Sequence, residues 1–248
     1  PRLNGETYMD RGIWAIWYDL PEQGNDEYLS WLHEVHLPEK LSRSGYLWAT
    51  HIENDMSDVR EETIHRTVKH VGHDFPNPGV PTGNQYLLLF GGISPHVFVN
   101  PSPPELETRW TPETKEMIEL RSNSRYCIFV EEERVQGPEY DTRAPGITPG
   151  PIIQFGTFNI NALENEDEMG AWYARSRLPL MEPMQGCVGA RKLVSIVGWA
   201  KHAIMYEFIS MEAVNRYFID TDEEWSKQVV KNLVHAPHSP SLGKRIWP

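Results

Sequence analysis

An internal repeat constrains the fold of this chain more than any other feature of its sequence. Residues 13–54 align with residues 154–195 without a gap, at a constant offset of 141 residues. The shared pattern is W-x5-L-P-x6-G, and Trp, Pro and Gly are rare or conformationally demanding residues, so their common register indicates a duplication. The identical pairs are Asp26/Asp167, Glu27/Glu168, Trp31/Trp172, Leu37/Leu178, Pro38/Pro179, Gly45/Gly186 and Ala49/Ala190, with Trp14 and Trp17 falling on Phe155 and Phe158.

Both copies predict the same order of elements, strand–helix–strand–strand–helix–strand. In the first copy we expect strands at 13–19, 46–53, 85–90 and 126–132, a helix capped by Asp26 and ended by Pro38, and a helix at 111–121 capped by Thr111. In the second copy we expect strands at 152–159, 188–194, 203–209 and 244–247, and helices at 168–177, 211–218 and 223–233.

This order predicts an α+β fold of two ferredoxin-like βαββαβ modules. The first strand is apolar on both faces, with Trp14, Ile16 and Tyr18 alternating with Ile13, Ala15 and Trp17, so both faces of its sheet should be buried. We therefore expect the two modules to pack sheet to sheet as an intramolecular α+β barrel. The predicted domains are residues 12–135, with a polar insertion at 55–84, and residues 152–248, joined by a Pro- and Gly-rich linker at 136–151.

Composition excludes several classes of partner. The chain of 248 residues carries a net charge of −12 and has no cluster of Lys and Arg, so nucleic acid is not an expected partner. No apolar run approaches the about 20 residues that span a bilayer, so no membrane partner is expected. The first residues are polar and the chain has two cysteines without metal or redox spacing, so we expect a cytoplasmic protein.

The word WLHEVHLP at residues 31–38, followed by Gly45 and a strand, resembles the EthD-like branch of the dimeric α+β-barrel superfamily. The resemblance implies a barrel that two chains normally form and that two fused copies form here, and it leaves open whether the chain is also a homodimer. The superfamily includes cofactor-free cyclases, isomerases, monooxygenases and haem enzymes, so the fold alone does not select the reaction. The histidine implied by the family motif is His36, which the second copy replaces with Arg177.

His36 and His33 are the candidate catalytic residues. They lie three residues apart on the predicted helix, which places them on one face, and a histidine can accept and return a proton near neutral pH. The alternative is a solvated helix end. A metal site is not predicted, because HEVH is one residue shorter than the H-E-x-x-H zinc motif, and no C-x-x-C-H word for covalent haem is present.

Aromatic and polar residues near the predicted strands are the candidate substrate-binding residues. They are Trp14, Tyr18, Trp48, His51, Tyr86 and His96. Alternation along the second strand separates His51 from Trp48, so we expect these two side chains on opposite faces.

These residues predict an enzyme that acts on a small aromatic or polyketide-like carbonyl compound without a cofactor. The expected reaction is that of a lyase, isomerase or cyclase, with proton transfer by His36. The alternatives are a haem-dependent or cofactor-free monooxygenase, and a small-molecule binding protein without catalysis.

Overall fold

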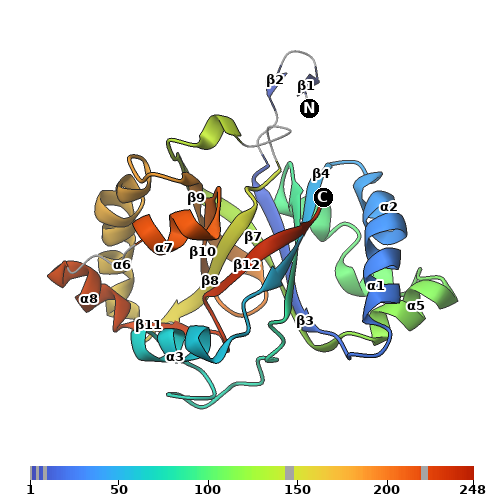
Figure 1. The fold of residues 1–248 in the computed structure, drawn as a ribbon, viewed down its shortest axis with the longest axis horizontal. Helices are drawn as coiled ribbons and strands as arrows, with labels where there is room; N and C mark the ends of the chain where they lie inside the picture. The colour runs from blue at the N-terminus through green and yellow to red at the C-terminus, as the bar shows by residue number, and fades with distance from the viewer. Residues whose placement is uncertain (1, 4–5, 8–9, 143–147, 219–222) are drawn as a thin grey trace.

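The computed structural model describes residues 2–3, 6–7, 10–142, 148–218 and 223–248. Its centre is a closed antiparallel barrel with the strand order β10-β9-β7-β3-β6-β4-β12-β8, in which β8 pairs back to β10 (Figure 1). The strands are β3 (Gly12–Asp19), β4 (Tyr46–Asn54), β6 (Tyr86–Gly92), β7 (Ser122–Gln136), β8 (Ile152–Ile160), β9 (Cys187–Val197), β10 (His202–Phe208) and β12 (Ser241–Trp247).

Two groups of four strands, one from each half of the chain, form this barrel. The order is β7-β3-β6-β4 in the first group and β12-β8-β10-β9 in the second, which is the order fourth-first-third-second in both. The β7–β9 and β4–β12 ladders join the groups. The predicted mixed α+β class and the barrel are therefore confirmed.

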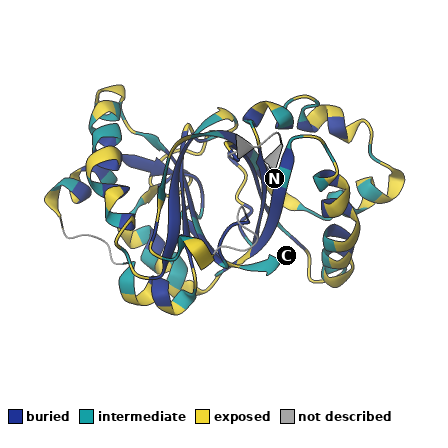
Figure 2. Cartoon of the chain, turned by 90° about the horizontal axis from the view of Figure 1, so that it is seen from above, coloured by how far each residue is buried: buried dark blue, intermediate teal, exposed yellow. Residues whose placement is uncertain are grey.

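Helices cover the outside of the barrel on two opposite sides, with their exposed faces outward (Figure 2). On the first half they are α1 (Asn25–Trp31), the π-helix η1 (Leu32–His36), α2 (Leu37–Leu41) and α5 (Pro112–Glu119). On the second half they are α6 (Glu166–Trp172), the π-helix η5 (Tyr173–Arg177), the 3-10 turn η6 (Pro179–Met181), α7 (Met211–Tyr217) and α8 (Glu224–Val230). Within the described residues, every helix is too short or too polar to cross a bilayer.

The described residues form one apolar core between each group of strands and its helices, one inside the barrel, and a smaller one between the insertion and the segment around β11. The predicted burial of both faces of the first strand is confirmed, since Trp14 faces the helices and Trp17 faces the barrel interior. At one end of the barrel, buried Asp10 accepts hydrogen bonds from Arg134, Arg191 and Trp48. This network satisfies charges that would otherwise be costly to bury.

The insertion at 55–84 folds against the other half of the chain. It contains α3 (Asp58–Thr67) and the short strand β5 (Lys69–His70), which pairs in parallel with β11 (Leu233–His235). Arg60 of α3 donates hydrogen bonds to Gln154 and to the carbonyl of Pro240. Figure 1 shows α3 beside β11, on the side of the barrel that carries α6 and α8. The insertion thus packs on the second half of the chain and extends its sheet by one short strand.

The expectation that Pro38 ends the first helix is wrong. The helix continues through α2 to Leu41, and it begins after Gly24 rather than at a cap on Asp26. Proline cannot donate a backbone hydrogen bond, but the π-helical turn before it shifts the hydrogen-bond pattern, and Leu37 bonds to Leu32 five residues back. The helix therefore passes a proline without a break.

The offset of 141 residues holds for the helices and fails on the first strand of each copy. The helices α1 and α6 and the π-helices η1 and η5 correspond residue for residue, and Gly45 and Gly186 both adopt positive φ at the following turn. Trp14, however, faces the helices, whereas Phe155 faces the barrel interior. Because a shift of one residue moves a side chain to the other face of a strand, the first strands are not equivalent at this offset.

The outer parts of the predicted linker are described, including the 3-10 turn η3 (Tyr140–Thr142), while residues 143–147 lie outside the described residues. Other short elements are β1 (Arg2–Leu3), β2 (Glu6–Thr7), η2 (Pro95–Phe98), α4 (Pro103–Glu107) and η4 (Leu163–Asn165).

Candidate functional site

Three of the predicted residues form a hydrogen-bonded chain in the first half. His33 Nε2 lies 2.8 Å from His51 Nδ1, and His51 Nε2 lies 2.8 Å from the hydroxyl of Tyr18. His33 belongs to the π-helix η1, and π-helical turns are rare and frequent at functional sites. Tyr18 lies in β3 and His51 in β4, with β6 between these two strands, and both side chains are fully buried.

The chain of hydrogen bonds continues beyond Tyr18. Arg121 Nε donates to the hydroxyl of Tyr28 at 2.6 Å, and arginine can only donate. Tyr28 also hydrogen-bonds to Tyr18, which connects it through His51 to His33. His33 is half-buried and its ring stacks on Trp247 at 6.0 Å. The chain therefore runs from the partly buried contact of Arg121, through buried Tyr18 and His51, to half-buried His33.

Burial keeps the inner members of this chain neutral. It lowers the pKa of His51 well below its usual value, and nearby His33 and Arg121 act in the same direction. It raises the pKa of Tyr18 well above its usual value. The pKa of His33 is also lowered by burial. A neutral chain of this kind can pass a proton along its hydrogen bonds without holding a buried charge.

The two histidines of the HEVH word do not share one set of contacts. The ring of His36 is buried against Trp31 at 4.8 Å, and its Nδ1 has no hydrogen-bond partner in the described part of the protein. Burial, together with Arg121, Lys40 and Arg43, lowers its pKa well below the usual value. His33 contacts His51 and Trp247, whereas His36 contacts Trp31, and the placement of both histidines on one helix face stays a prediction.

The other predicted residues are spread over the first half. Tyr86 stacks on Tyr18 at 5.7 Å and belongs to the same cluster. Trp14 packs in the helix-side core against Phe90. Trp48 points into the barrel interior and donates to Asp10, and the expected separation of Trp48 from His51 is confirmed. His96 is exposed beyond the opposite end of the β6 strand from Tyr86.

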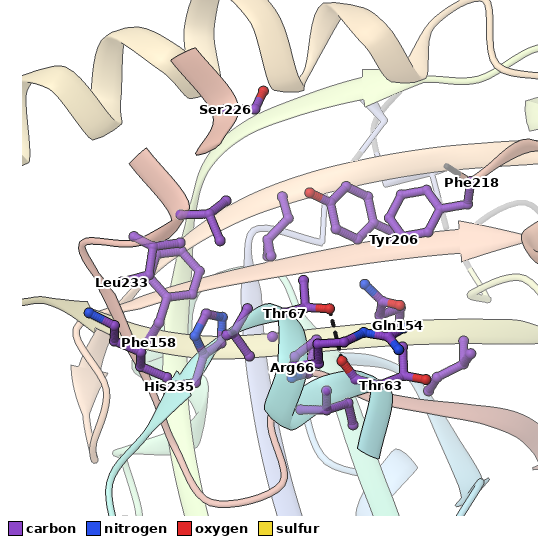
Figure 3. Close-up of a pocket in the computed structure, with 18 of the residues that line it drawn as sticks. Thr63, Arg66, Thr67, Gln154, Phe158, Tyr206, Phe218, Ser226, Leu233 and His235 are labelled. Carbon is purple, nitrogen blue, oxygen red and sulfur yellow. Dashed lines mark hydrogen bonds between the residues drawn. The ribbon is translucent and has the colours of Figure 1, made fainter. Parts of the chain in front are cut away.

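A cavity of about 800 Å³ lies in the second half, between the barrel wall and the helices. None of the residues predicted from the sequence lines it. Its aromatic lining comes from β8, α6, η5, β10 and the end of α7, and α3 of the insertion forms the facing wall (Figure 3). These aromatic residues are Phe158, Trp172, Tyr173, Tyr206 and Phe218. The volume lies in the range of sites for small molecules and cofactors.

The second π-helix supplies the charged group of this cavity. Arg177 of η5 is buried, its Nε donates to the hydroxyl of Tyr206 at 2.7 Å, and its guanidinium lies over the rings of Tyr206 and Phe218. Trp172 Nε1 donates to Ser226 at 3.0 Å, which joins α6 to α8 in the wall of the cavity. Arg177 stands at the position of His36 in the other copy.

Two histidines, His65 and His235, line the cavity, and His235 is the buried one. It is buried, and its Nδ1 has no hydrogen-bond partner among the described residues. Burial, reinforced by His70, lowers its pKa to about 3, although a hydrogen bond to the backbone of Lys69 opposes the shift. The ring is therefore neutral at pH 7. Across the ranges that the structure describes, no group of three or more metal-binding side chains occurs.

Sequence reasoning missed Arg177, Tyr206 and His235. The offset of 141 residues already places Arg177 at the position of His36, so the repeat contained a signal for it. His235 carried no signal, because its contact with β5 depends on how the insertion folds.

Comparisons with known proteins support the fold. No protein-family model matches the chain, and no curated protein matches its sequence. A candidate monooxygenase from Fusobacterium nucleatum has a similar structure, with a TM-score of 0.56 and 7% identity over 95% of this chain and 93% of that one. An anthrone oxidase-like protein has a TM-score of 0.54 and 10% identity over 95% and 90% of the two chains.

Chlorite dismutase from Candidatus Nitrospira defluvii, in complex with imidazole, is similar with a TM-score of 0.52 and 10% identity, over 96% and 92% of the two chains. The chain thus shares the ferredoxin-like α+β-barrel fold of these proteins. Their names correct our main functional expectation, because none of these three is a lyase, isomerase or cyclase. The names of these similar proteins fit the monooxygenase alternative better. The EthD-like resemblance rests on the sequence motif alone.

Proposed function

We propose that this chain is an oxygen-using oxidoreductase of the monooxygenase type, with its substrate in the second-half cavity. The observation that carries the proposal is the cavity itself, an aromatic-walled space of about 800 Å³ with a buried Arg177–Tyr206 pair at its wall. The similar structures of a candidate monooxygenase and an anthrone oxidase-like protein support this class of reaction.

For the domain architecture, we propose a fused tandem of two ferredoxin-like modules, residues 12–135 and 152–248, of the EthD-like branch.

A flat, electron-rich aromatic compound suits these walls. In a reaction without a cofactor, a ring CH₂ group is oxidised to C=O by O₂, one oxygen atom enters the product and the other leaves as water. The substrate supplies all the electrons, so no external reductant is needed. Such a substrate reacts through its deprotonated form, and a buried guanidinium lowers the pKa of an adjacent acidic group. Arg177 is placed to stabilise this anion.

Oxygen uptake with anthrone as the substrate tests the proposal, with anthraquinone formation followed by absorbance. We expect Arg177→Gln to lower turnover by about 10²-fold, in the range found when one charge-stabilising donor is removed. Arg177→Lys keeps the charge and should retain more activity. His36→Gln is the matched variant at the repeated position. If His36→Gln abolishes turnover and Arg177→Gln does not, the site lies in the first half at His33 and His36.

A haem-dependent form of the same reaction is the second candidate, and His235 favours it. A neutral imidazole with an unpartnered nitrogen is the form that binds iron, and its low pKa makes it a weak general base. His235 would hold the iron, and Lys and Arg at the cavity mouth would hold the propionates. A bound haem would supply oxygen chemistry through its iron. Haem titration of the protein should give a Soret band that His235→Gln shifts, whereas a spectrum identical to free haem would exclude this candidate.

The free, buried cysteines Cys127 and Cys187 fit a reducing compartment, and we propose a cytoplasmic location on that basis.

A further inference from the structure

The lining of the second-half cavity differs in charge from the rest of the chain. The whole chain has 35 acidic and 23 basic residues. Of the described residues that line the cavity, six are Arg or Lys and one, Asp74, is acidic. The six are Arg60, Arg66, Lys69, Arg177, Lys227 and Lys231. In a chain with a net charge of −12, this reversal of sign at one cavity needs an explanation.

The exposed cations of the cavity lining, the cationic rim, come from two segments that are distant in sequence. Arg66 and Lys69 belong to the insertion, at the end of α3 and in β5, while Lys227 and Lys231 belong to α8 and its C-terminal end. All four side chains are exposed. Within the described part of the chain, Arg66, Lys69 and Lys231 form no ion pair with a carboxylate. A charged rim beside low-dielectric walls attracts and concentrates ions of the opposite sign.

The cavity combines this rim with apolar walls. Arg177 is buried over the rings of Tyr206 and Phe218. Figure 3 shows Phe158, Tyr206 and Phe218 along the cavity, where aromatic rings form part of the wall. A ligand that satisfies both features has a flat aromatic body and at least one negative charge. A neutral aromatic ligand would use the walls and leave the cations without a role.

We propose that the second-half cavity selects aromatic anions, such as aromatic carboxylates or phenolates, and that the insertion at 55–84 provides half of the cationic rim. This inference rests on the assignment of the cavity as the substrate site and adds the charge class of the substrate. The insertion packs on the second half and the second copy has only the short segment 196–201 in its place, so one such site per chain is expected.

Titration calorimetry with 2-naphthoate and its neutral analogue 2-naphthalenemethanol tests the proposal. We expect one site per chain and at least tenfold tighter binding of the naphthoate. Raising the salt concentration about tenfold should weaken only the naphthoate, because screening acts on the charged ligand. Equal affinities for the two probes, or two equivalent sites, would overturn the proposal.

Charge reversal at the rim provides the matched comparison. Arg66→Glu with Lys231→Glu should weaken naphthoate binding at least tenfold and leave naphthalenemethanol unchanged. Arg109→Glu with Lys115→Glu makes the same change in net charge at exposed sites of the first half and should have little effect. If both double variants reduce the affinity equally, the effect is the net charge of the molecule and the rim has no specific role.

Location is tested by filling the cavity. Val230 lines it from α8, and Val230→Trp should prevent the binding of both probes while the variant keeps its circular dichroism spectrum. Unchanged binding would place the probes elsewhere and contradict the proposal. These experiments do not depend on oxygen uptake. Naphthoate binding without oxygen uptake would support the charge preference and contradict the oxygenase assignment. Oxygen uptake together with binding of neutral aromatics alone would support the oxygenase assignment and overturn the charge preference.

Discussion

Single buried hydroxyl groups of the first half connect strands to helices. Tyr18 joins His51 of β4 to Tyr28 of α1, and all three side chains are fully buried. We expect Tyr18→Phe to destabilise the fold by about 1–3 kcal/mol, because it leaves buried partners without a hydrogen bond. Urea unfolding measures the change. Tyr86→Phe removes a hydroxyl whose hydrogen bond to Asn25 is only partly buried, so it should cost less. Equal effects of the two substitutions would show that the chain of hydrogen bonds is not a unit.

Histidines buried in the neutral form make stability depend on pH. Burial lowers the pKa of His235 to about 3 and that of His202, with help from Lys192, to about 4. The unfolded chain titrates these groups near pH 6.5 and so binds more protons than the folded chain below that pH. Their contribution to stability is therefore present above about pH 6.5 and is lost as the pH falls toward 4.

Urea unfolding at about pH 7 and pH 5 checks this prediction. We expect a lower unfolding free energy at pH 5, with a slope of up to about 1.4 kcal/mol per pH unit for each such histidine. His235→Gln should reduce the slope, whereas His96→Gln, at an exposed position, should not. A slope that His235→Gln does not change would assign the pH dependence to other groups.

At the scale of elements, the two π-helical turns bring the functional side chains into place. A π-helical turn contains one residue more than an α-helical turn, so deletion of one residue should restore α-helix and change the relative directions of the side chains within that turn. Glu34 in η1 and Ala174 in η5 are exposed and can be deleted without removing a core side chain. Deletion of Ala174 should separate Tyr173 from Arg177 and weaken naphthoate binding at least tenfold.

Deletion of Glu34 is the control for this prediction, because it alters the first half only. It should break the His33–His51 hydrogen bond and leave naphthoate binding unchanged, with both variants checked by thermal melting. An unchanged affinity after deletion of Ala174 would mean that the π-helical geometry does not shape the cavity.

Element by element, the sequence predicted most of the structure that forms locally. The strands and helices of both copies lie close to their expected positions because alternation, caps such as Thr111, and turn glycines are local signals. The π-helical turns escaped prediction, since a change of hydrogen-bond partner leaves no mark in composition. The hydrogen bond between His33 and His51 depends on that turn and was not foreseen, although both residues were candidates.

The cavity escaped prediction for a different reason. It forms where α3, inserted in the first half of the sequence, packs on β8 and the segment before β12 in the second half. This contact is distant in sequence and involves polar residues without a periodic pattern. An interpretation that treats each copy as an independent module cannot find this contact. Such an interpretation therefore placed the candidate site in the first half, which contains His33 and His36.

For the whole molecule, the barrel interior makes the two halves depend on each other. Trp17 from the first half packs edge-on against Phe155 from the second at 5.5 Å, and Phe129 also contacts Phe155 at 5.9 Å. The β4–β12 and β7–β9 ladders would be open edges in either half alone. Separation would expose both these edges and a continuous apolar face, which monomeric proteins rarely tolerate.

We therefore expect residues 1–140 and residues 150–248, expressed separately, to aggregate or to melt without a cooperative transition. Co-expression should restore a soluble 1:1 complex that melts in one transition, because the interior of the barrel and both ladders can then form. Size-exclusion chromatography and thermal melting measure these outcomes. A soluble monomer of either half that unfolds cooperatively would show that each module has a sufficient core of its own, and the shared barrel interior would then be an interface between two independently stable domains.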